Sequence, residues 1–304
     1  MKILIGYDGS TYADAALKDM RRAGLPEEGE MLVLSVAEGG LQAPTSIGMV
    51  QTEFTNSWKD RVAKAEELAR DAATLVQSYF PKWSVRGEAL WGDPADVILE
   101  MTTSWRPDLV VLGSHGRSPV ARLFLGSVSL KVVNNARCSV RVCRAGTATS
   151  SEPLMLVVGN DGSKEAEAVI RTVAGRQWPE KTEVHVVSVA ESLLPVTELL
   201  AESTYAYDRA ATIVLNNDEA ELDRLRKVAD TSAATLRRAG LIPVPVTLEG
   251  NPSHEILTEA NRWNADTIFV GARGLGKLDR LLLGGVSSNL VAHAHCTVEV
   301  VRAA

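Results

Sequence analysis

The sequence predicts an α/β protein made of two tandem, doubly wound domains, each with a five-stranded parallel sheet and helices on both faces. First, strand-like apolar runs alternate with helical patterns, which favours parallel strands joined by right-handed crossovers. Second, motifs of the first half return in the same order in the second half. For 304 residues, two domains of about 150 residues are the natural expectation. We place them at residues 1–146 and 153–304, on either side of a short polar linker.

Four pairs of short motifs define the duplication. Those offset by 153 residues are Asp8-Gly9-Ser10 with Asp161-Gly162-Ser163, and residues 35–38 with 188–191. Those offset by 158 residues are 92–94 with 250–252, and 138–140 with 296–298. The second half therefore carries five extra residues, between Glu191 and Gly250.

The elements of the first half are expected in a fixed order. Strands are predicted at residues 3–7, 31–36, 84–90, 109–112 and 139–143. Helices are predicted at residues 11–22, 57–79, from Pro94 onward, and at 127–135. Most of the strands are continuous apolar runs, typical of strands buried on both faces, whereas residues 84–90 alternate and suit an edge. Asp93 is a plausible N-cap with Pro94 at the first helical position. The second half repeats this order over residues 154–302, with a longer loop from Glu191 to about Asn216.

A frame of three glycines follows the fourth predicted strand of each half. The frames are Gly113, Gly116 and Gly126-Ser127 in the first half, and Gly271, Gly274 and Gly284-Gly285 in the second. Glycine permits positive φ and a close approach of backbone to ligand, and the start of a helix attracts phosphate. If strands 1 and 4 are neighbours, each frame borders a crevice at the carboxyl ends of the strands, where such sheets bind ligands.

Asp8 ends the first strand, and two interpretations of it stay open. Its carboxylate could accept from a ribose hydroxyl or an adenine amino group. Alternatively, Asp-Gly is a common turn pair, and Asp8 would only form a turn or cap the next helix. The matching glycine frame favours the ligand interpretation. His115 and Arg117, inside the first frame, could contact phosphate, but His115 could instead cap the loop and Arg117 could be solvated, as could Arg273 of the second frame.

With these motifs the chain resembles the universal stress protein family, as a tandem member with two fused domains. The resemblance rests on the aspartate after strand 1 and on the pattern G-x₂-G-x₉-G-[ST], and it covers nearly the whole chain. It implies the sheet order 3-2-1-4-5, binding of ATP or of AMP or ADP, with or without Mg²⁺, and a role in stress survival. It also implies pairing of the two domains through their last strands, as an internal pseudo-dimer that a further homodimer could extend.

The resemblance extends to individual residues. With His115 and Arg117, the candidate contacts of the first half are Asp8, Gly9, Ser10, Val36, Gly113, Gly116, Gly126, Ser127, Val128 and Ser129. Those of the second half are Asp161, Gly162, Ser163, Val189, Gly271, Gly274, Gly284, Gly285, Val286 and Ser287. The second half departs from the pattern at Gly285, where the family has Ser or Thr, so its site is expected to be weaker by about 1 kcal/mol.

Composition argues against several other classes of protein. A net charge of −6 and a pI near 5.5 do not match a duplex-DNA binder. No apolar run approaches the ~18 residues of a membrane span, the N-terminus is too short for a signal peptide, and three cysteines suit a reducing cytoplasm. Residues 271–277 imitate a P-loop but lack its Ser/Thr, and residues 293–296 read as a helix end, not a metal cluster.

Three functions are compatible with these observations. We favour a nucleotide-binding regulatory protein that acts through a conformational or partner change. The alternative is an enzyme, either a slow ATPase or a protein that phosphorylates itself, although neither half shows a nucleophile–base pair. The third is a dimerisation scaffold with vestigial pockets. Valine at Gly113 or Gly126 is expected to block the first site with the fold retained, because both are placed in a loop.

Overall fold

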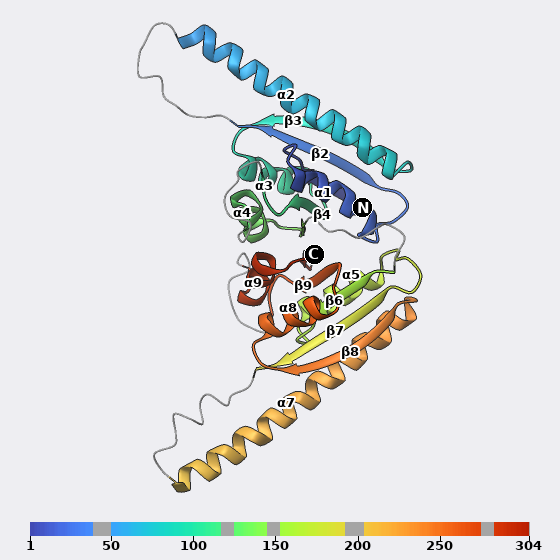
Figure 1. Ribbon diagram of the computed structural model, residues 1–304, viewed down its shortest axis with the longest axis vertical. Helices are drawn as coiled ribbons and strands as arrows, with labels where there is room; N and C mark the ends of the chain where they lie inside the picture. The colour runs from blue at the N-terminus through green and yellow to red at the C-terminus, as the bar shows by residue number, and fades with distance from the viewer. Residues whose placement is uncertain (39–49, 117–124, 145–152, 192–203, 275–282, 304) are drawn as a thin grey trace. The chain divides into compact units, whose positions relative to one another are not determined.

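A computed structural model describes residues 1–38, 50–116, 125–144, 153–191, 204–274 and 283–303. The chain forms two compact units, which divide near residue 150, and each is described by itself (Figure 1). The strands of the first unit are β1 (Lys2–Gly6), β2 (Glu30–Ala37), β3 (Ser84–Trp91), β4 (Leu109–Gly113) and β5 (Ser139–Cys143). Its helices are α1 (Thr11–Asp19), continued by a 3₁₀ turn at Met20–Arg22, then α2 (Val50–Tyr79), α3 (Pro94–Ser104) and α4 (Ser127–Asn135).

The second unit repeats this sequence of elements. Its strands are β6 (Met155–Gly159), β7 (Glu183–Ala190), β8 (Ile242–Glu249), β9 (Thr267–Gly271) and β10 (Thr297–Val301). Its helices are α5 (Lys164–Ala174), α7 (Thr204–Arg238), α8 (Pro252–Arg262) and α9 (Gly285–His293). Helix α7 has 35 residues and α2 has 30, so the difference equals the five extra residues of the second half.

All neighbouring strands within each unit are parallel. The first unit has the predicted order β3-β2-β1-β4-β5, and the second has the equivalent order β8-β7-β6-β9-β10. The predicted adjacency of strands 1 and 4 is confirmed, since Ile3 pairs with Leu109 and Ile5 with Val111. The carboxyl ends of β1 and β4 therefore lie side by side.

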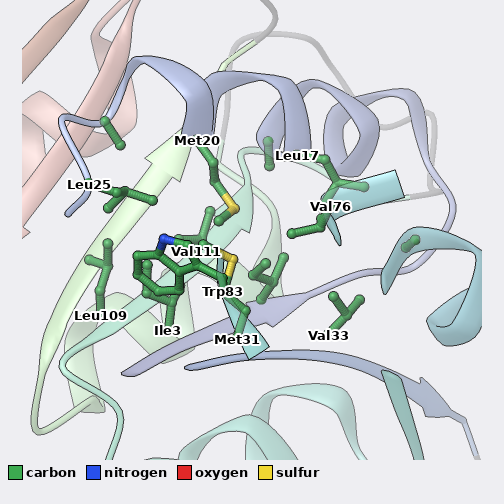
Figure 2. Close-up of a cluster of buried hydrophobic side chains, with 14 of the residues drawn as sticks. Ile3, Leu17, Met20, Leu25, Met31, Val33, Val76, Trp83, Leu109 and Val111 are labelled. Atoms are coloured by element: carbon green, nitrogen blue, oxygen red, sulfur yellow. The ribbon is translucent and has the colours of Figure 1, made fainter. Parts of the chain in front are cut away.

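Each unit has a large apolar core on the face of the sheet that carries its first two helices. In the first unit, Leu17 of α1 and Val76 of α2 pack with Ile3, Met31 and Val111 of the strands (Figure 2). The buried side of α2 carries several alanines, whose small side chains let this long helix lie close to the strands. The helices α3 and α4 cover the other face.

Both long helices begin earlier than expected. Helix α2 starts at Val50, not at about residue 57, and α7 starts at Thr204, whereas a loop was predicted as far as about Asn216. Asn56 and the pair Asn216-Asn217 therefore lie inside the two helices. Asparagine inside a helix is less favourable than alanine by only about 0.7 kcal/mol or less, which a long helix tolerates.

A buried hydrogen-bonded pair of titratable side chains distinguishes the second unit. His185 Nδ1 of β7 lies 2.8 Å from Glu259 Oε1 of α8, and both side chains are buried. Burial lowers the pKa of His185, while Glu259 and Glu183 raise it less and Arg262 lowers it. Because the folded state disfavours the charged imidazole, the unfolded chain takes up the proton first as the pH falls.

We therefore expect the second unit to lose stability as the pH falls below about 6.5, with a slope of at most about 1.4 kcal/mol per pH unit. Hydrogen exchange of the β7 amides at several pH values would measure this. The double variant His185→Leu/Glu259→Met introduces the residues found at the equivalent positions of the first half, Leu32 and Met101. It should flatten the pH dependence, and an unchanged slope would exclude this pair as its source.

Candidate functional site

The aspartate turn and the glycine frame meet at the carboxyl ends of β1 and β4. A Cβ atom built on Gly116 would lie 3.0 Å from Asp8 Oδ2, so the two motifs are in direct contact. The second unit repeats this, since a Cβ on Gly274 would lie 2.5 Å from Asp161 Oδ2. A side chain at either glycine would occupy the space beside the carboxylate.

Asp8 forms a turn as well as facing the frame. Its Oδ1 accepts a hydrogen bond from Ser10 N–H at 3.0 Å, and Gly9 has a φ of 75°. Ser10, not Asp8, is the N-cap of α1, because Ser10 Oγ accepts from Ala13 N–H at 3.2 Å. The turn interpretation thus accounts for one carboxylate oxygen, and the other lies against Gly116.

The same turn occurs at the end of β6. Asp161 Oδ1 accepts from Ser163 N–H at 2.9 Å, Gly162 has a φ of 79°, and Ser163 caps α5 through Ala166 N–H. Each aspartate is therefore fixed in orientation by a local hydrogen bond before any ligand binds.

The glycine frames are required for close approach and not for positive φ. Gly126 has ordinary extended backbone angles, φ −62° and ψ 149°, and the described glycines with positive φ lie outside both frames. A Cβ on Gly126 would lie 3.3 Å from both His115 Cα and Ser114 O. Contact with neighbouring backbone favours glycine at Gly113 and Gly126, whereas at Gly116 and Gly274 the contact is with the aspartate carboxylate.

Gly113 corrects one sequence-based expectation. It is the buried last residue of β4, not a loop residue, and a Cβ there would lie 2.8 Å from the carbonyl carbon of Tyr12. Valine at Gly113 would therefore disturb the packing of β4 against α1 and lower the stability of the first unit. Gly126 remains the position at which valine separates binding from folding.

Helices α4 and α9 begin without a side-chain cap. The other α-helices for which an N-cap residue is described are capped by a side-chain oxygen, from Ser10, Asp93, Ser163 and Asn251. The caps of α4 and α9 are Gly126 and Gly284, which provide none. In each of these helices the N–H groups of the first turn have no acceptor within the helix. They form a set of donors that suits an anion.

The first-turn donors of α4 belong to Ser127, Val128 and Ser129. Ser127 is exposed, but Ser129 is buried and its Oγ donates to Gly113 O at 2.7 Å. In α9, Ser287 Oγ likewise donates to Gly271 O at 2.6 Å. These two buried serines tie a helix start to the end of a strand, so their backbone N–H groups, more than their hydroxyls, face the site.

Gly285 takes the place of Ser127 in the second unit. A Cβ built on it would meet no atom within 4 Å, and its φ is not positive. Val286 follows it in the first turn of α9. Nothing in the described surroundings of Gly285 would oppose a larger side chain.

The residue just before the second glycine of each frame, His115 or Arg273, contacts the first turn of the helix that follows the aspartate. The ring of His115 lies against Tyr12, with centroids 4.8 Å apart, and its Nδ1 is 3.0 Å from Ser114 Oγ. At the equivalent positions, Arg273 pairs with Glu165 at 3.4 Å. His115 Nε2 is buried without a protein partner in the described structure. Arg117 lies outside the described residues.

The end of the second strand completes the crevice. Ser35 Oγ donates to Tyr7 O at 2.8 Å, and Ser188 Oγ donates to Asn160 O at 2.7 Å, which joins the carboxyl ends of adjacent strands. Val36 and Val189 follow these serines and are only half-buried, unlike the residues before them. The repeated Ser-Val pairs thus place an accessible strand end beside each aspartate.

Two arginines at this edge were not predicted from the sequence. Arg61 of α2 donates to Glu38 O at 3.1 Å, and Arg224 of α7 donates to Asp161 O at 3.3 Å. The hydrogen bond from Arg224 lowers the pKa of Glu221. No short motif marks either arginine, because long-range helix packing brings them to the site.

Burial, together with a hydrogen bond to Asp14, raises the pKa of Tyr7 above its ordinary value. The hydroxyl donates to Asp14 Oδ1 at 2.6 Å. Tyr7 is therefore a neutral donor next to Asp8 and not a candidate base.

The structure also places the two motifs that imitate other sites, the P-loop-like residues 271–277 and the metal-like residues 293–296. The frame that imitates a P-loop follows β9, which is the fourth strand of its unit, and residues 275–277 lie outside the described chain. His293 Nδ1 lies 3.0 Å from Asn289 O at the end of α9. Within the described residues, no three His, Cys, Asp or Glu side chains are grouped as a metal site, and no helix has the length and apolar character needed to cross a membrane.

A family model, curated relatives and a solved structure all match this chain to the same protein family. The model of the universal stress protein family matches residues 1–144 and again residues 155–302. A universal stress protein of Mycobacterium tuberculosis is 30% identical over 315 residues, which covers 99% of this chain and 96% of that protein. One from Thermus aquaticus is 32% identical over 142 residues, or 47% of this chain and 97% of the relative. The crystal structure of a universal stress protein from Archaeoglobus fulgidus shares the fold, with a TM-score of 0.65, 21% identity and coverage of 99% and 98% of the two chains.

Proposed function

Since the chain belongs to the universal stress protein family, with two copies of the family domain, we propose that each half binds an adenine nucleotide. The observation that carries this proposal is the uncapped start of α4, set against Gly116 and Asp8. Phosphate would accept from the first-turn N–H groups of residues 127–129, and Ser127 would add a hydroxyl. The second site would use the same elements around Gly284 and Asp161. The domain limits of 1–146 and 153–304 are part of this proposal.

The remaining parts of a nucleotide fit the residues at hand. Asp8 Oδ2 faces the frame and would accept from a ribose hydroxyl, and the backbone at Val36 would meet the base. Glycine at 116 and 126 leaves the space that a Cβ would fill. ATP, ADP and AMP share these groups, and Mg²⁺ would accompany a triphosphate.

We propose binding, not catalysis, as the main activity. The protein would respond to nucleotide by a conformational or partner change that serves stress survival in the cytoplasm. The side chains placed at the first site are turn, cap or packing residues, since Tyr7 donates to Asp14 and Ser129 donates to a carbonyl. A slow ATPase or a self-phosphorylating enzyme is the alternative, and product formation during incubation with ATP would distinguish it.

A pseudo-dimer of the two domains through their last strands remains part of the proposal. It follows from the family resemblance and from the equivalent positions of residues 139–143 and 297–301 at one end of each unit's strand order. An unpaired edge there would invite uncontrolled strand addition.

Ligand released from the purified protein tests the proposed function. Native mass spectrometry, followed by denaturation and identification of the released small molecule, should find AMP, ADP or ATP. A protein that never retains or takes up an adenine nucleotide would favour the scaffold with vestigial pockets.

The two sites should differ in affinity because of one hydroxyl. Gly285→Ser is expected to tighten the second site, and Ser127→Gly to loosen the first, each by about 1 kcal/mol or roughly fivefold. Serine fits at Gly285 without strain, because no atom lies within 4 Å of a Cβ built there and its φ is not positive. Calorimetric titration of the two single variants would measure this. If neither affinity moves, the hydroxyl of Ser127 takes no part in binding.

A further inference from the structure

The outer edges of the two sheets are built differently. At the inner side of β3, Ser84 N–H donates to Gly29 O at 2.9 Å and Gly92 N–H donates to Ala37 O at 3.2 Å. The backbone N–H and C=O groups of successive residues in a strand point to opposite sides. Those of Val85, Gly87 and Ala89 therefore point away from β2, toward the open side of the sheet. Within the described part of the first unit, β3 pairs with β2 alone.

The corresponding edge of the second unit is blocked. Ile242 N–H and Gly250 N–H point inward, to Thr182 O and Ala190 O, so residues 243 and 245 point outward. Both are proline, which has no N–H and prevents the addition of a strand. The residues at the equivalent positions of β3 are Val85 and Gly87, and only the first unit therefore keeps an edge competent for pairing.

The open edge borders a groove and an exposed aromatic pair. The groove lies between α2 and β3 and is lined by residues that include Arg70, Gln77 and Gly87. Near it, Trp58 and Trp91 contact edge to face, with centroids 6.3 Å apart, and their exposed fractions are 40% and 41%. Exposed tryptophan at an open edge is typical of interaction surfaces.

The second unit lacks this aromatic pair too. The buried residues Ala65, Ala69, Ala73 and Val76 of α2 have the same spacing as Leu225, Ala229, Ala233 and Leu236 of α7. In that alignment Trp58 corresponds to Asp218, and Trp91 corresponds to Glu249 by strand register. The apolar and open character is therefore a property of the first unit's edge.

Charge on β3 is self-complementary about Gly87. When two copies of this strand pair antiparallel with Gly87 opposite itself, Arg86 lies opposite Glu88 of the partner subunit, and the reverse holds on the other side of the axis. These are non-hydrogen-bonded positions, where facing side chains are closest. In the single chain the guanidinium of Arg86 lies over the ring of Trp105, 5.8 Å from the centroid, and pairing with Glu88 of the partner subunit would draw it away from that ring.

We propose that the β3 edge of the first unit is an isologous docking surface for a second copy of this chain. Antiparallel pairing of β3 with β3 would supply hydrogen bonds at Val85, Gly87 and Ala89, and two Arg86–Glu88 pairs would select the register. The prolines of β8 leave one such surface per chain, so the assembly would close at two copies.

Sedimentation equilibrium of the full chain over a range of concentrations tests this proposal. The wild type should dimerise reversibly. Glu88→Arg places arginines opposite each other and should weaken the dimer at least about tenfold. The double swap Arg86→Glu/Glu88→Arg restores opposite charges and should restore the dimer. Glu100→Arg, the same charge change at an exposed residue of α3, is the control and should leave the dimer unchanged.

A second variant addresses the backbone. Val85→Pro copies Pro243 of the second unit and should leave the chain monomeric, with a thermal melt close to that of the wild type. A wild type that stays monomeric at all concentrations would overturn the proposal. It would also be overturned if Glu88→Arg dimerised as well as Glu100→Arg, or if the folded double swap recovered nothing.

Discussion

Valine at Gly126 is expected to remove nucleotide binding from the first site while the fold survives. The backbone angles at this position suit any residue, so no strain arises from φ. The new Cβ would press on His115 Cα and Ser114 O at 3.3 Å, and the branched side chain would enter the phosphate space. Loss of two charge-assisted hydrogen bonds, at about 1.5–3 kcal/mol each, corresponds to a loss of affinity of roughly a hundredfold or more.

Calorimetry with ATP would show this loss as a fall in stoichiometry from two sites to one. Gly284→Val is the matched change in the second unit, where the nearest atoms, Ala272 O and Arg273 Cα, lie at an ordinary 3.5 Å. It should affect the second site alone. Unchanged affinity and stoichiometry in Gly126→Val, with nucleotide bound by the parent, would remove the glycine frame from the phosphate site.

Valine at Gly113 is expected to destabilise the first unit by about 1–3 kcal/mol, the usual range for overpacking. Its Cβ would meet main-chain atoms of Tyr12 and Ala13 at 2.8–3.0 Å. Main chain cannot rotate away as a side chain can, so α1 would have to move. Hydrogen exchange of the β4 amides would report the loss.

Gly271→Val is the comparison for this effect. Its Cβ would lie 2.9 Å from Glu165 Cβ and 3.1 Å from Arg273 O, a mixed contact in which part of the neighbourhood can adjust. The loss in the second unit should be smaller. Equal and negligible losses in both variants would show that α1 and α5 shift freely at their first turns.

The fold could be predicted because its determinants are local and repeated. Buried parallel strands are continuous apolar runs, and the start of α3 is marked by Asp93 before Pro94, where the structure shows the expected cap. The beginnings of α2 and α7 could not be predicted, because polar residues inside a long helix resemble a helix start. Their extent is decided by the whole helix and its packing, which no short window records.

The candidate site could be predicted only in part. Motif spacing indicated that Asp8 and Gly116 share one crevice, and the structure brings them into contact. The sequence did not show why each frame position needs glycine, because this depends on which atoms of distant segments lie next to it in the fold. The sequence also could not reveal that Ser129 donates to Gly113 O, or that Arg224 reaches Asp161 O, because these contacts join distant segments.

Calorimetric titration of the ligand-free chain with ATP tests the central claim most directly. The expected result is two binding events per chain, with the first site tighter by roughly fivefold because Ser127 has no hydroxyl counterpart at Gly285. Absence of any binding heat from a folded chain freed of ligand, with AMP and ADP equally silent, would contradict the claim that the two glycine frames are nucleotide sites.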